Sequence, residues 1–451
     1  MKVNIGFFVI LLIVFLPIKV YGSSESLLIV FSGEETGNLE PCGCYEGQIG
    51  GISKRYTVID SFRKKKDVIL PVSLGDLPKS SGRQEEIKME IFCRAIGEMD
   101  YILHNLGEKD IEIGPQLINY LSHTSKTVLL SSNVQLVASF PAKINQYVLK
   151  ECFVSGHTLK IAFLGILSKS LLNNYVLEYI NVKEPIQALK PLVKQLQEEA
   201  NLIVLLSHAS LSESIEIAKF FPEIGLIITG HNIEEPTDSI TYINNTPVVS
   251  PGIEGKYVGI AKYSINNAVV ERKSVEVISL ESKYKDSLEM LSLLKEYQQI
   301  LADEDLLSKI PQIPLSNDLS YVGGATCGIC HKIVYEHWRK TTHSTSYSTL
   351  VNKGYQYDPE CIKCHTTGNG YVSGFLNYEK NSSLINIGCE SCHGAGSRHI
   401  KYVTEPYDVT DENNCVVCHE SEHSPKFQYN EYWKKIKHPE EMFGKIPKTM
   451  E

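Results

Sequence analysis

Short apolar runs alternate with helix-like stretches over the first 280 residues. The runs read SLLIVFSG, DVILPVSLGD, KTVLLSSN, LKIAFLGI, NLIVLLSHAS, IGLIITGHN, TPVVSPG and YVGIAKYSI. They have the length and branched-residue content of buried strands, and the segments between them have the period of helices. This alternation predicts an α/β domain over residues 23–280, with strands buried under helical layers.

Residues 281–317 have a different pattern. Apolar side chains recur at helical spacing at Leu288, Leu291, Leu294, Tyr297 and Leu301, and PQIPLSND follows. The spacing predicts a connecting helix that packs against one of two domains, and an extended linker after it. Residues 318–451 are then expected to form a second, mainly helical and irregular domain, whose longest helix we expect over residues 331–350.

The N-terminus has the layout of a secretory signal peptide. Lys2 precedes an apolar run over residues 5–16, and Val20-Tyr21-Gly22 supplies small residues before Ser23. Cleavage after Gly22 would export the protein to the periplasm. An uncleaved membrane anchor is the alternative, but the run is shorter than the ~20 residues that a spanning helix needs. We expect no transmembrane segment after the signal peptide.

The net charge of −9 and the lack of a long basic run argue against nucleic-acid binding. Cysteine use changes the picture more, because eight of the 12 cysteines lie between Cys327 and Cys418. They form CGICH, CIKCH, CESCH and CVVCH, and C-x-x-C-H is the attachment motif of haem c. The attachment residues are Cys327, Cys330, His331, Cys361, Cys364, His365, Cys389, Cys392, His393, Cys415, Cys418 and His419.

Two other uses of these cysteines fit less well. Disulfides need an even number of thiols but no histidine after every second one. Eight thiolates with four histidines also overfill two tetrahedral zinc sites. The sequence therefore predicts four covalently bound haems c, with His331, His365, His393 and His419 as proximal iron ligands.

Low-spin haems need a sixth ligand, commonly His or Met. Few methionines lie in this region, so histidine is the expected ligand. The remaining histidines are His337, His343, His399, His423 and His438. His399 is six positions after His393 and is expected to reach a neighbouring haem. Close haem spacing would let electrons pass along the domain.

The last 130 or so residues resemble the multihaem cytochrome c-552/c-554 family of periplasmic electron carriers. The resemblance rests on CGICHKIVYEHWRKTTHSTSYSTL, CESCHGAGSRH and CVVCHESEHSPKFQYNEYWKKIKH. It implies that His343, His399 and His438 are distal ligands, with His337 and His423 as further candidates. In this family one haem can lack a distal ligand, which opens its iron to small molecules.

Polar residues follow several of the predicted strands in the N-terminal half. Asp76, Asn133, His208 and His231 each follow an apolar run. Sites in α/β proteins lie at the carboxyl ends of strands. Carboxylate, amide and imidazole groups together suit a pair of divalent metals that activate water against a phosphoester.

This half resembles the 5′-nucleotidase-type metallophosphoesterases, through TGNLEPCGCYEGQIGGISKRYTVID, SLGD, NLGEKDIEIG, LLSHAS, LIITGHN and VVSPGIEGKYVGIAKY. The resemblance implies a four-layer αββα sandwich with a two-metal centre. The family's Asp-x-His appears as Glu34 and Thr36, and its Asn-His pair as Glu108 and Lys109. Its Gly-His-x-His also breaks off after His231. Asp76, His208 and His231 remain as a degenerate divalent-metal site.

Four cysteines lie outside the haem motifs. Cys42 and Cys44 are spaced too closely for an unstrained disulfide with each other, which favours metal binding or pairing with another thiol. Cys93 and Cys152 either form a structural disulfide or are buried as small apolar residues.

Three functional hypotheses follow from these features. The first is an exported tetrahaem electron carrier that serves periplasmic or membrane-bound redox partners, with a phosphoesterase-like domain as scaffold or docking module. The second is a multihaem oxidoreductase that acts on a small nitrogen or sulfur compound at a five-coordinate haem. The third is a metal-dependent phosphohydrolase with a cytochrome tail.

Overall fold

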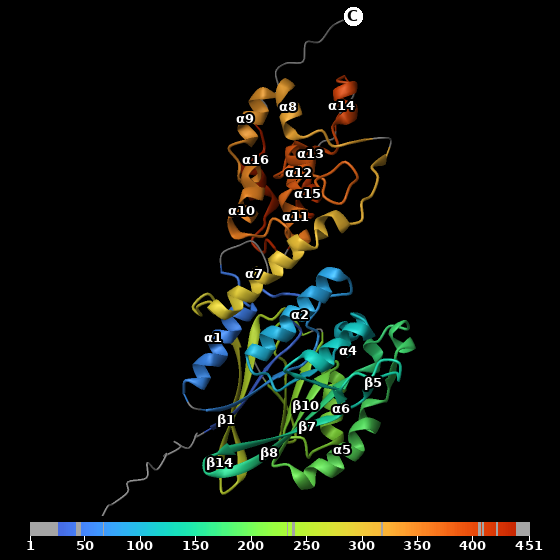
Figure 1. Cartoon of the computed structure of the whole chain (residues 1–451). Helices are drawn as coiled ribbons and strands as arrows, with labels where there is room; N and C mark the ends of the chain where they lie inside the picture. The colour runs from blue at the N-terminus through green and yellow to red at the C-terminus, as the bar shows by residue number, and fades with distance from the viewer. Residues whose placement is uncertain are drawn as a thin grey trace, which may run out of the picture.

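The structure is a computed structural model of the whole chain, and it contains two domains joined by a long helix (Figure 1). It describes residues 26–41, 47–65, 67–231, 233–236, 240–316, 319–404, 407, 410–420 and 423–438. The predicted signal peptide and the pair Cys42 and Cys44 lie outside these described residues.

A seven-stranded sheet forms one half of the N-terminal sandwich, in the order β15-β14-β1-β2-β3-β4-β6. The strands from β1 to β6 in that order pair in parallel, whereas β14 and β15 add an antiparallel edge. Their bounds are β1 Ser26–Ser32, β2 Val68–Ser73, β3 Leu103–Asn105, β4 Val128–Leu130, β6 Ile144–Asn145, β14 Tyr257–Asn266 and β15 Val269–Ser279.

A six-stranded sheet faces the first, in the order β12-β13-β11-β10-β8-β7. Its central strands β8, β10, β11 and β13 are parallel, and β7 and β12 close the two edges antiparallel. The bounds are β7 Tyr147–Val154, β8 His157–Leu167, β10 Leu202–His208, β11 Leu226–Gly230, β12 Thr241–Ile243 and β13 Thr246–Val249. A small ladder of β5 (Val134–Leu136) and β9 (Ile180–Val182) lies beside them.

Helices cover the outer face of each sheet. The inner faces of the sheets share one core, in which Phe31 of β1 packs in the same cluster as Phe163 of β8. The first sheet is covered by α1 (Ile52–Arg63), α2 (Arg83–Glu98) and α7 (Leu288–Asp303), and the second by α5 (Pro185–Glu199) and α6 (Leu211–Phe220). The four-layer αββα sandwich that the resemblance implied is therefore confirmed.

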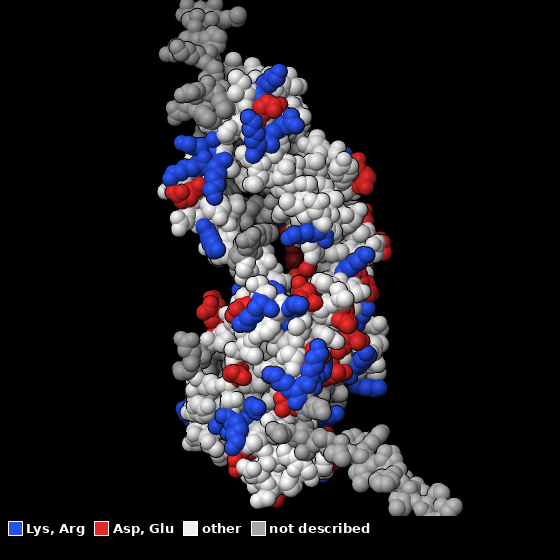
Figure 2. All heavy atoms as spheres, turned by 90° about the vertical axis from the view of Figure 1, so that its left-hand side faces the viewer, with Lys and Arg blue, Asp and Glu red and all other residues white. Residues whose placement is uncertain are grey.

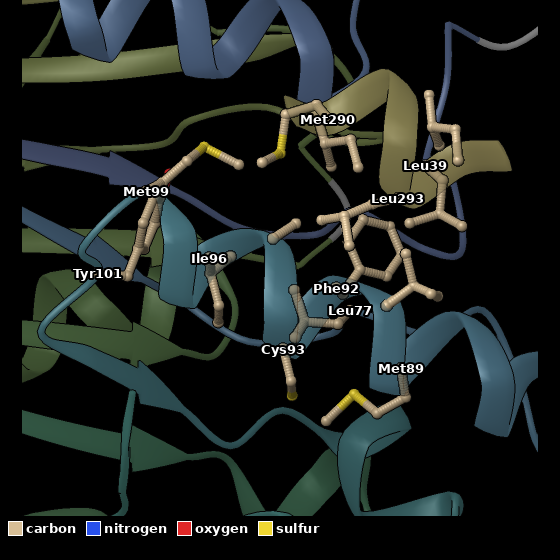
Figure 3. Close-up of a cluster of buried hydrophobic side chains, with 14 of the residues drawn as sticks. Leu39, Leu77, Met89, Phe92, Cys93, Ile96, Met99, Tyr101, Met290 and Leu293 are labelled. Atoms are coloured by element: carbon tan, nitrogen blue, oxygen red, sulfur yellow. The ribbon is translucent and has the colours of Figure 1, made fainter. Parts of the chain in front are cut away.

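The expected connecting helix is α7, and it packs against α1 and α2 as part of an outer layer (Figure 3). Ser287 caps its first turn by accepting a hydrogen bond from the Met290 amide. The buried stripe consists of Met290, Leu293, Leu294, Tyr297 and Leu301. The predicted stripe was partly wrong, because Leu288 and Leu291 are exposed, at 80% and 40%.

The C-terminal domain consists of short helices and irregular chain. The helices are α8 (Gly324–Cys330), α9 (Lys332–Trp338), α10 (Ser346–Lys353), α11 (Pro359–His365), α12 (Tyr378–Asn381), α13 (Cys389–His393), α14 (Ser397–Lys401), α15 (Glu412–Val416) and α16 (Tyr429–Ile436). The single long helix expected over residues 331–350 was wrong: the helical path breaks between α9 and α10, where Thr341 is extended and a 3-10 turn follows. A small apolar cluster that includes Tyr347, Ile362 and Phe375 is the core.

In the part of the chain that the structure describes, no helix combines the length and the apolar character needed to cross a bilayer.

Candidate functional site

The first candidate site lies at the carboxyl ends of four neighbouring strands. Glu34 follows β1, Asp76 follows β2, His208 ends β10 and His231 follows β11. Their ligand atoms all lie within 4.8 Å of one another, and the first three side chains are buried. The structure thus brings together the three residues that the sequence analysis selected, and adds Glu34.

The backbone at this site is unusual. Glu34, Asp76 and His231 have positive φ angles of 56°, 57° and 108°, a region that side chains other than glycine rarely adopt. The loops are held by the buried Asp110 carboxylate, which accepts hydrogen bonds from the backbone N–H groups of Asp76 and Gly107. Such strain persists where the surrounding structure fixes it, and it clusters at functional sites.

Glu108, at the start of α3 (Glu108–Glu112), completes the cluster. Its carboxylate lies 2.5 Å from His208 Nε2 and 3.4 Å from His231 Nδ1. The Nε2 atom of His208 is also 3.3 Å from Asp76, and its Nδ1 atom is 3.2 Å from Glu34. Two imidazoles and three carboxylates therefore converge.

Burial makes negative charge on these carboxyl groups costly. Burial raises the pKa of Glu34 to about 8 and that of Asp76 to about 7, although His208 acts in the opposite direction. Burial also opposes ionisation of Glu108, but the hydrogen bond and charge of His208 lower its pKa to about 2. Glu34 Oε1 is buried and accepts no hydrogen bond. These residues fit a divalent metal ion, which would neutralise the carboxylates.

The sequence analysis missed Glu34 and Glu108 as donors, because it treated them as departures from the family pattern. The available signal for Glu34 was its position directly after the predicted strand SLLIVFSG. Glu108 had no such signal, because the three-residue strand β3 that precedes it was not predicted. The ammonium of Lys109 pairs with Glu112 at 3.1 Å, and the backbone N–H of Lys109 donates a hydrogen bond to the Asp76 carboxylate. Asn133 instead donates to the carbonyl oxygens of Leu167 and Lys183, which is a structural role.

The second candidate site is formed by the four C-x-x-C-H motifs, which lie on α8, α11, α13 and α15 or directly after them. The thiols of Cys327 and Cys389 lie within hydrogen-bonding distance, as do those of Cys364 and Cys418. Burial raises the pKa of the Cys392 thiol, and the nearby Cys415 thiol raises it further. The motifs therefore form a contiguous series in the order first, third, fourth, second.

Histidines from distant segments lie opposite three of the motif histidines. The ring centroids of His331 and His399 are 6.2 Å apart, those of His393 and His438 are 5.9 Å apart, and those of His419 and His343 are 6.2 Å apart. Two imidazoles that bind one metal from opposite sides, through bonds of about 2 Å, have centroids about 6 Å apart. These three pairs fit the two axial positions of a haem iron.

His365 has a different environment. Its Nδ1 atom lies 2.7 Å from the carbonyl oxygen of Ser346, a contact that orients the ring and leaves Nε2 for a metal. Among the residues that the structure describes, no histidine ring lies opposite His365 at the spacing of the other pairs. Of the two remaining candidates, His337 lies near His438, and His423 pairs with Glu420.

Apolar side chains around the motifs support the same fit. Ile329 lies inside the first motif and Ile333 follows it, and they are 80% and 63% exposed; Val416 and Val417 lie inside the fourth motif. Groups of exposed apolar side chains mark surfaces that another apolar body covers, and a porphyrin is such a body.

Cys93 and Cys152 are both free thiols, which excludes the structural disulfide between them. Cys93 is buried in the core beneath α7, and Cys152 borders the core between the sheets.

Comparison with known proteins gives separate matches for the two domains. Residues 326–394 match the family described as cytochrome c554 and c-prime. Cytochrome c-554 of Nitrosomonas europaea is 30% identical over 97 residues, which cover 18% of this chain and 41% of that protein. The 2′,3′-cyclic-nucleotide 2′-phosphodiesterase/3′-nucleotidase of Salmonella typhimurium is 21% identical over 230 residues, or 45% of this chain and 35% of that protein.

Among solved structures, the calcineurin-like phosphoesterase YfkN of Bacillus subtilis superposes with a TM-score of 0.51 at 17% identity, over 61% of this chain and 97% of that one. This likeness concerns the fold. The chain spans less than half the length of the two curated relatives named above. The cytochrome match implies covalently bound haem c and redox partners. The chain thus joins a domain with the calcineurin-like phosphoesterase fold to a segment that is similar to the cytochrome c554 and c-prime family.

Proposed function

We propose that this protein is an exported tetrahaem electron carrier, in which the N-terminal domain is a scaffold. The observation that carries the proposal is the set of three facing histidine pairs, each at a spacing of 5.9 to 6.2 Å. In this proposal His399, His438 and His343 are the distal ligands opposite His331, His393 and His419. Bis-histidine ligation blocks direct chemistry at the iron and favours electron transfer.

The contacts between thiols of different motifs favour one order of the haems along the path of electron transfer. The first motif touches the third, the third lies beside the fourth, and the fourth touches the second. The haems would then form a chain that runs from the outer end of the domain at α8 to α11, the helix nearest the N-terminal domain (Figure 1).

The test is to mature the full chain in an export-competent host and measure its intact mass and haem content. We expect added mass of about four haems, loss of residues 1–22, and reversible reduction and reoxidation of every haem. Failure of the haems to cycle reversibly would contradict the proposal, and an unprocessed N-terminus would indicate a membrane-anchored form.

A second candidate function concerns the haem at the second motif. Because no described histidine faces His365, we infer that this haem is five-coordinate and open to a small nitrogen or sulfur compound. Carbon monoxide should then shift the reduced spectrum by the contribution of one haem, and substitution of both Cys361 and Cys364 by Ala should abolish the shift. A spectrum that carbon monoxide leaves unchanged would exclude this candidate.

The N-terminal cluster supports a further part of the proposal. We propose that it holds one divalent cation through the carboxylates and imidazoles described above. Metal-activated water is the chemistry that such an ion supplies. The family's second set of ligands is incomplete here, since Thr36 and Lys109 replace histidines, so we expect no phosphoester turnover. Turnover with a generic phosphodiester would instead support the phosphohydrolase hypothesis.

Charge on the C-terminal domain favours a class of partner. Exposed Lys and Arg side chains gather on one face of this domain, on and around α9 and α16 (Figure 2). The exposed Lys and Arg residues of α9, of the two positions after it and of α16 are Lys332, Arg339, Lys340, Lys434 and Lys435, on a chain whose net charge is −9. Complementary charge steers encounter between redox proteins. We expect an acidic redox partner whose electron-transfer rate falls as salt concentration rises.

A further inference from the structure

The two domains meet where one short segment, residues 355–360, leads into the second haem motif. The Tyr355 hydroxyl donates to Glu40 at 2.5 Å, and the amide of Gln84 donates to Asp358 at 3.0 Å. The ammonium of Lys88 donates to Glu360 at 2.7 Å. The N-terminal domain therefore contacts the chain immediately ahead of Cys361.

Asp358 ties this contact to the helix that carries the motif. It is buried, and it caps α11 by accepting a hydrogen bond from the Glu360 amide at 3.0 Å. Its other carboxylate oxygen accepts from Gln298 of α7 at 3.1 Å. Because α2 and α7 both hold the capping residue, the N-terminal domain fixes where α11 begins.

Lys88 is the charged centre of the interface. Its side chain is only 4% exposed, and its ammonium lies 2.8 Å from Glu85 and 2.7 Å from Glu360. Burial opposes its charge, but the two carboxylates raise its pKa and keep it protonated. A buried charge is weakly screened, so it acts over a longer range than an exposed one.

The loop after β1 packs on the same group. A Cβ atom at Gly37 would lie 3.3 Å from Lys88 Nζ and 3.0 Å from Glu85 Oε2. Glu34, three residues earlier, belongs to the N-terminal cluster. The Lys88 ammonium therefore lies between the loop of the candidate metal site and the helix of the second haem motif.

We propose that Lys88 is a positioning residue that sets the reduction potential of the haem held by Cys361, Cys364 and His365. This inference rests on the proposed function, because it requires a haem at that motif. Reduction adds one electron to ferric iron and lowers the charge of the site by one, with no bond formed or broken. A fixed positive charge beside the motif favours the reduced state, so the Lys88 ammonium raises this potential relative to an uncharged side chain at the same position.

The test uses the full-length protein with all four haems attached, as verified by mass. Potentials are read by electron paramagnetic resonance during titration with dithionite and mediators. The signal that is missing from a variant lacking both Cys361 and Cys364 identifies the second haem. We expect Lys88→Met to lower this potential and to leave the other three unchanged. Glu360→Gln should raise it, and the double variant should return it toward the native value.

Two controls separate charge from packing. Lys88→Arg keeps the charge and should keep the potential. Arg94 is on the same helix as Lys88, and Arg94→Met, which removes an exposed ion pair with Glu296 of α7, should have no effect. An unchanged potential in both Lys88→Met and Glu360→Gln would overturn the inference, as would an equal fall in Lys88→Arg and Lys88→Met. If Lys88→Met does not fold, Glu360→Gln alone decides the sign. Absence of haem at the second motif in the native protein would refute the proposed function instead.

Discussion

The ring centroids of His343 and His419 lie 6.2 Å apart, and the planes of the two imidazoles are inclined by 39°. His343 lies between α9 and α10, far from the fourth motif in the sequence. Packing of the domain therefore supplies the partner ring that the C-x-x-C-H motif lacks.

Replacing His343 by Ala tests this pairing. Loss of the distal imidazole should convert the fourth haem from low-spin to high-spin, because one axial position loses its protein ligand. Electron paramagnetic resonance should show one haem fewer in the low-spin signal, with haem content unchanged. The exposed His123 is the matched control, since His123→Ala should leave the spectrum as it is. An unaltered spectrum in His343→Ala would exclude this residue as a ligand.

Metal binding by the N-terminal cluster can be measured directly. Equilibrium dialysis of the holoprotein against Mn²⁺ or Zn²⁺, followed by elemental analysis, should give one ion per chain beyond the haem iron. His208→Ala and Glu34→Gln should each weaken metal binding by more than about tenfold. Loss of a residue that only hydrogen-bonds to a metal ligand already weakens binding about tenfold, and loss of a ligand should weaken it more. Asp303→Asn, at an exposed carboxylate on α7, should bind as the native protein does. Equal binding by all variants would show that the ion lies elsewhere.

Helix α7 offers a matched pair of leucines for a stability test. Leu301 is fully buried in the core with α1 and α2, whereas Leu288 is 80% exposed. Leu301→Ala should lower the free energy of unfolding of the N-terminal domain by about 2–5 kcal/mol. Leu288→Ala should change it by no more than about 0.5 kcal/mol. Urea unfolding followed by far-ultraviolet circular dichroism measures both, and equal losses would contradict the assigned packing.

Glu40 should make the stability of the domain interface depend on pH. Burial raises the pKa of Glu40 above its usual value, against the hydrogen bond from Tyr355, which lowers it. The folded protein therefore retains this proton where the unfolded chain releases it. The resulting stabilisation is complete below the unfolded pKa and is lost as pH rises through the folded pKa.

Glu40→Gln removes this dependence while an amide oxygen still accepts the Tyr355 hydrogen bond. The variant should melt at a higher temperature than the native protein at pH 7.5, and at nearly the same temperature at pH 4. Glu281→Gln, at an exposed carboxylate paired with Lys283, serves as the control. A melting temperature that falls at pH 7.5 would show that the Glu40 charge stabilises the interface.

Local patterns predicted some features well and others poorly. Alternation of apolar runs gave the layers of the sandwich, because each run must bury both faces of a strand. The stripe of α7 was shifted at its start, since Leu288 and Leu291 fit the helical period as well as Met290 and Leu293 do. Only the position of α1 and α2 decides which of these side chains is covered.

The candidate sites divide in the same way. The spacing of each C-x-x-C-H motif is a local property, so the sequence alone identifies every thiol and proximal histidine that a haem would use. The facing of His343 and His419, the convergence of Glu34 and Glu108 on His208, and the contact of Lys88 with Glu360 depend on segments far apart in the chain. Tertiary packing decided these relationships, because the chain path sets distances between remote side chains and no local period encodes it.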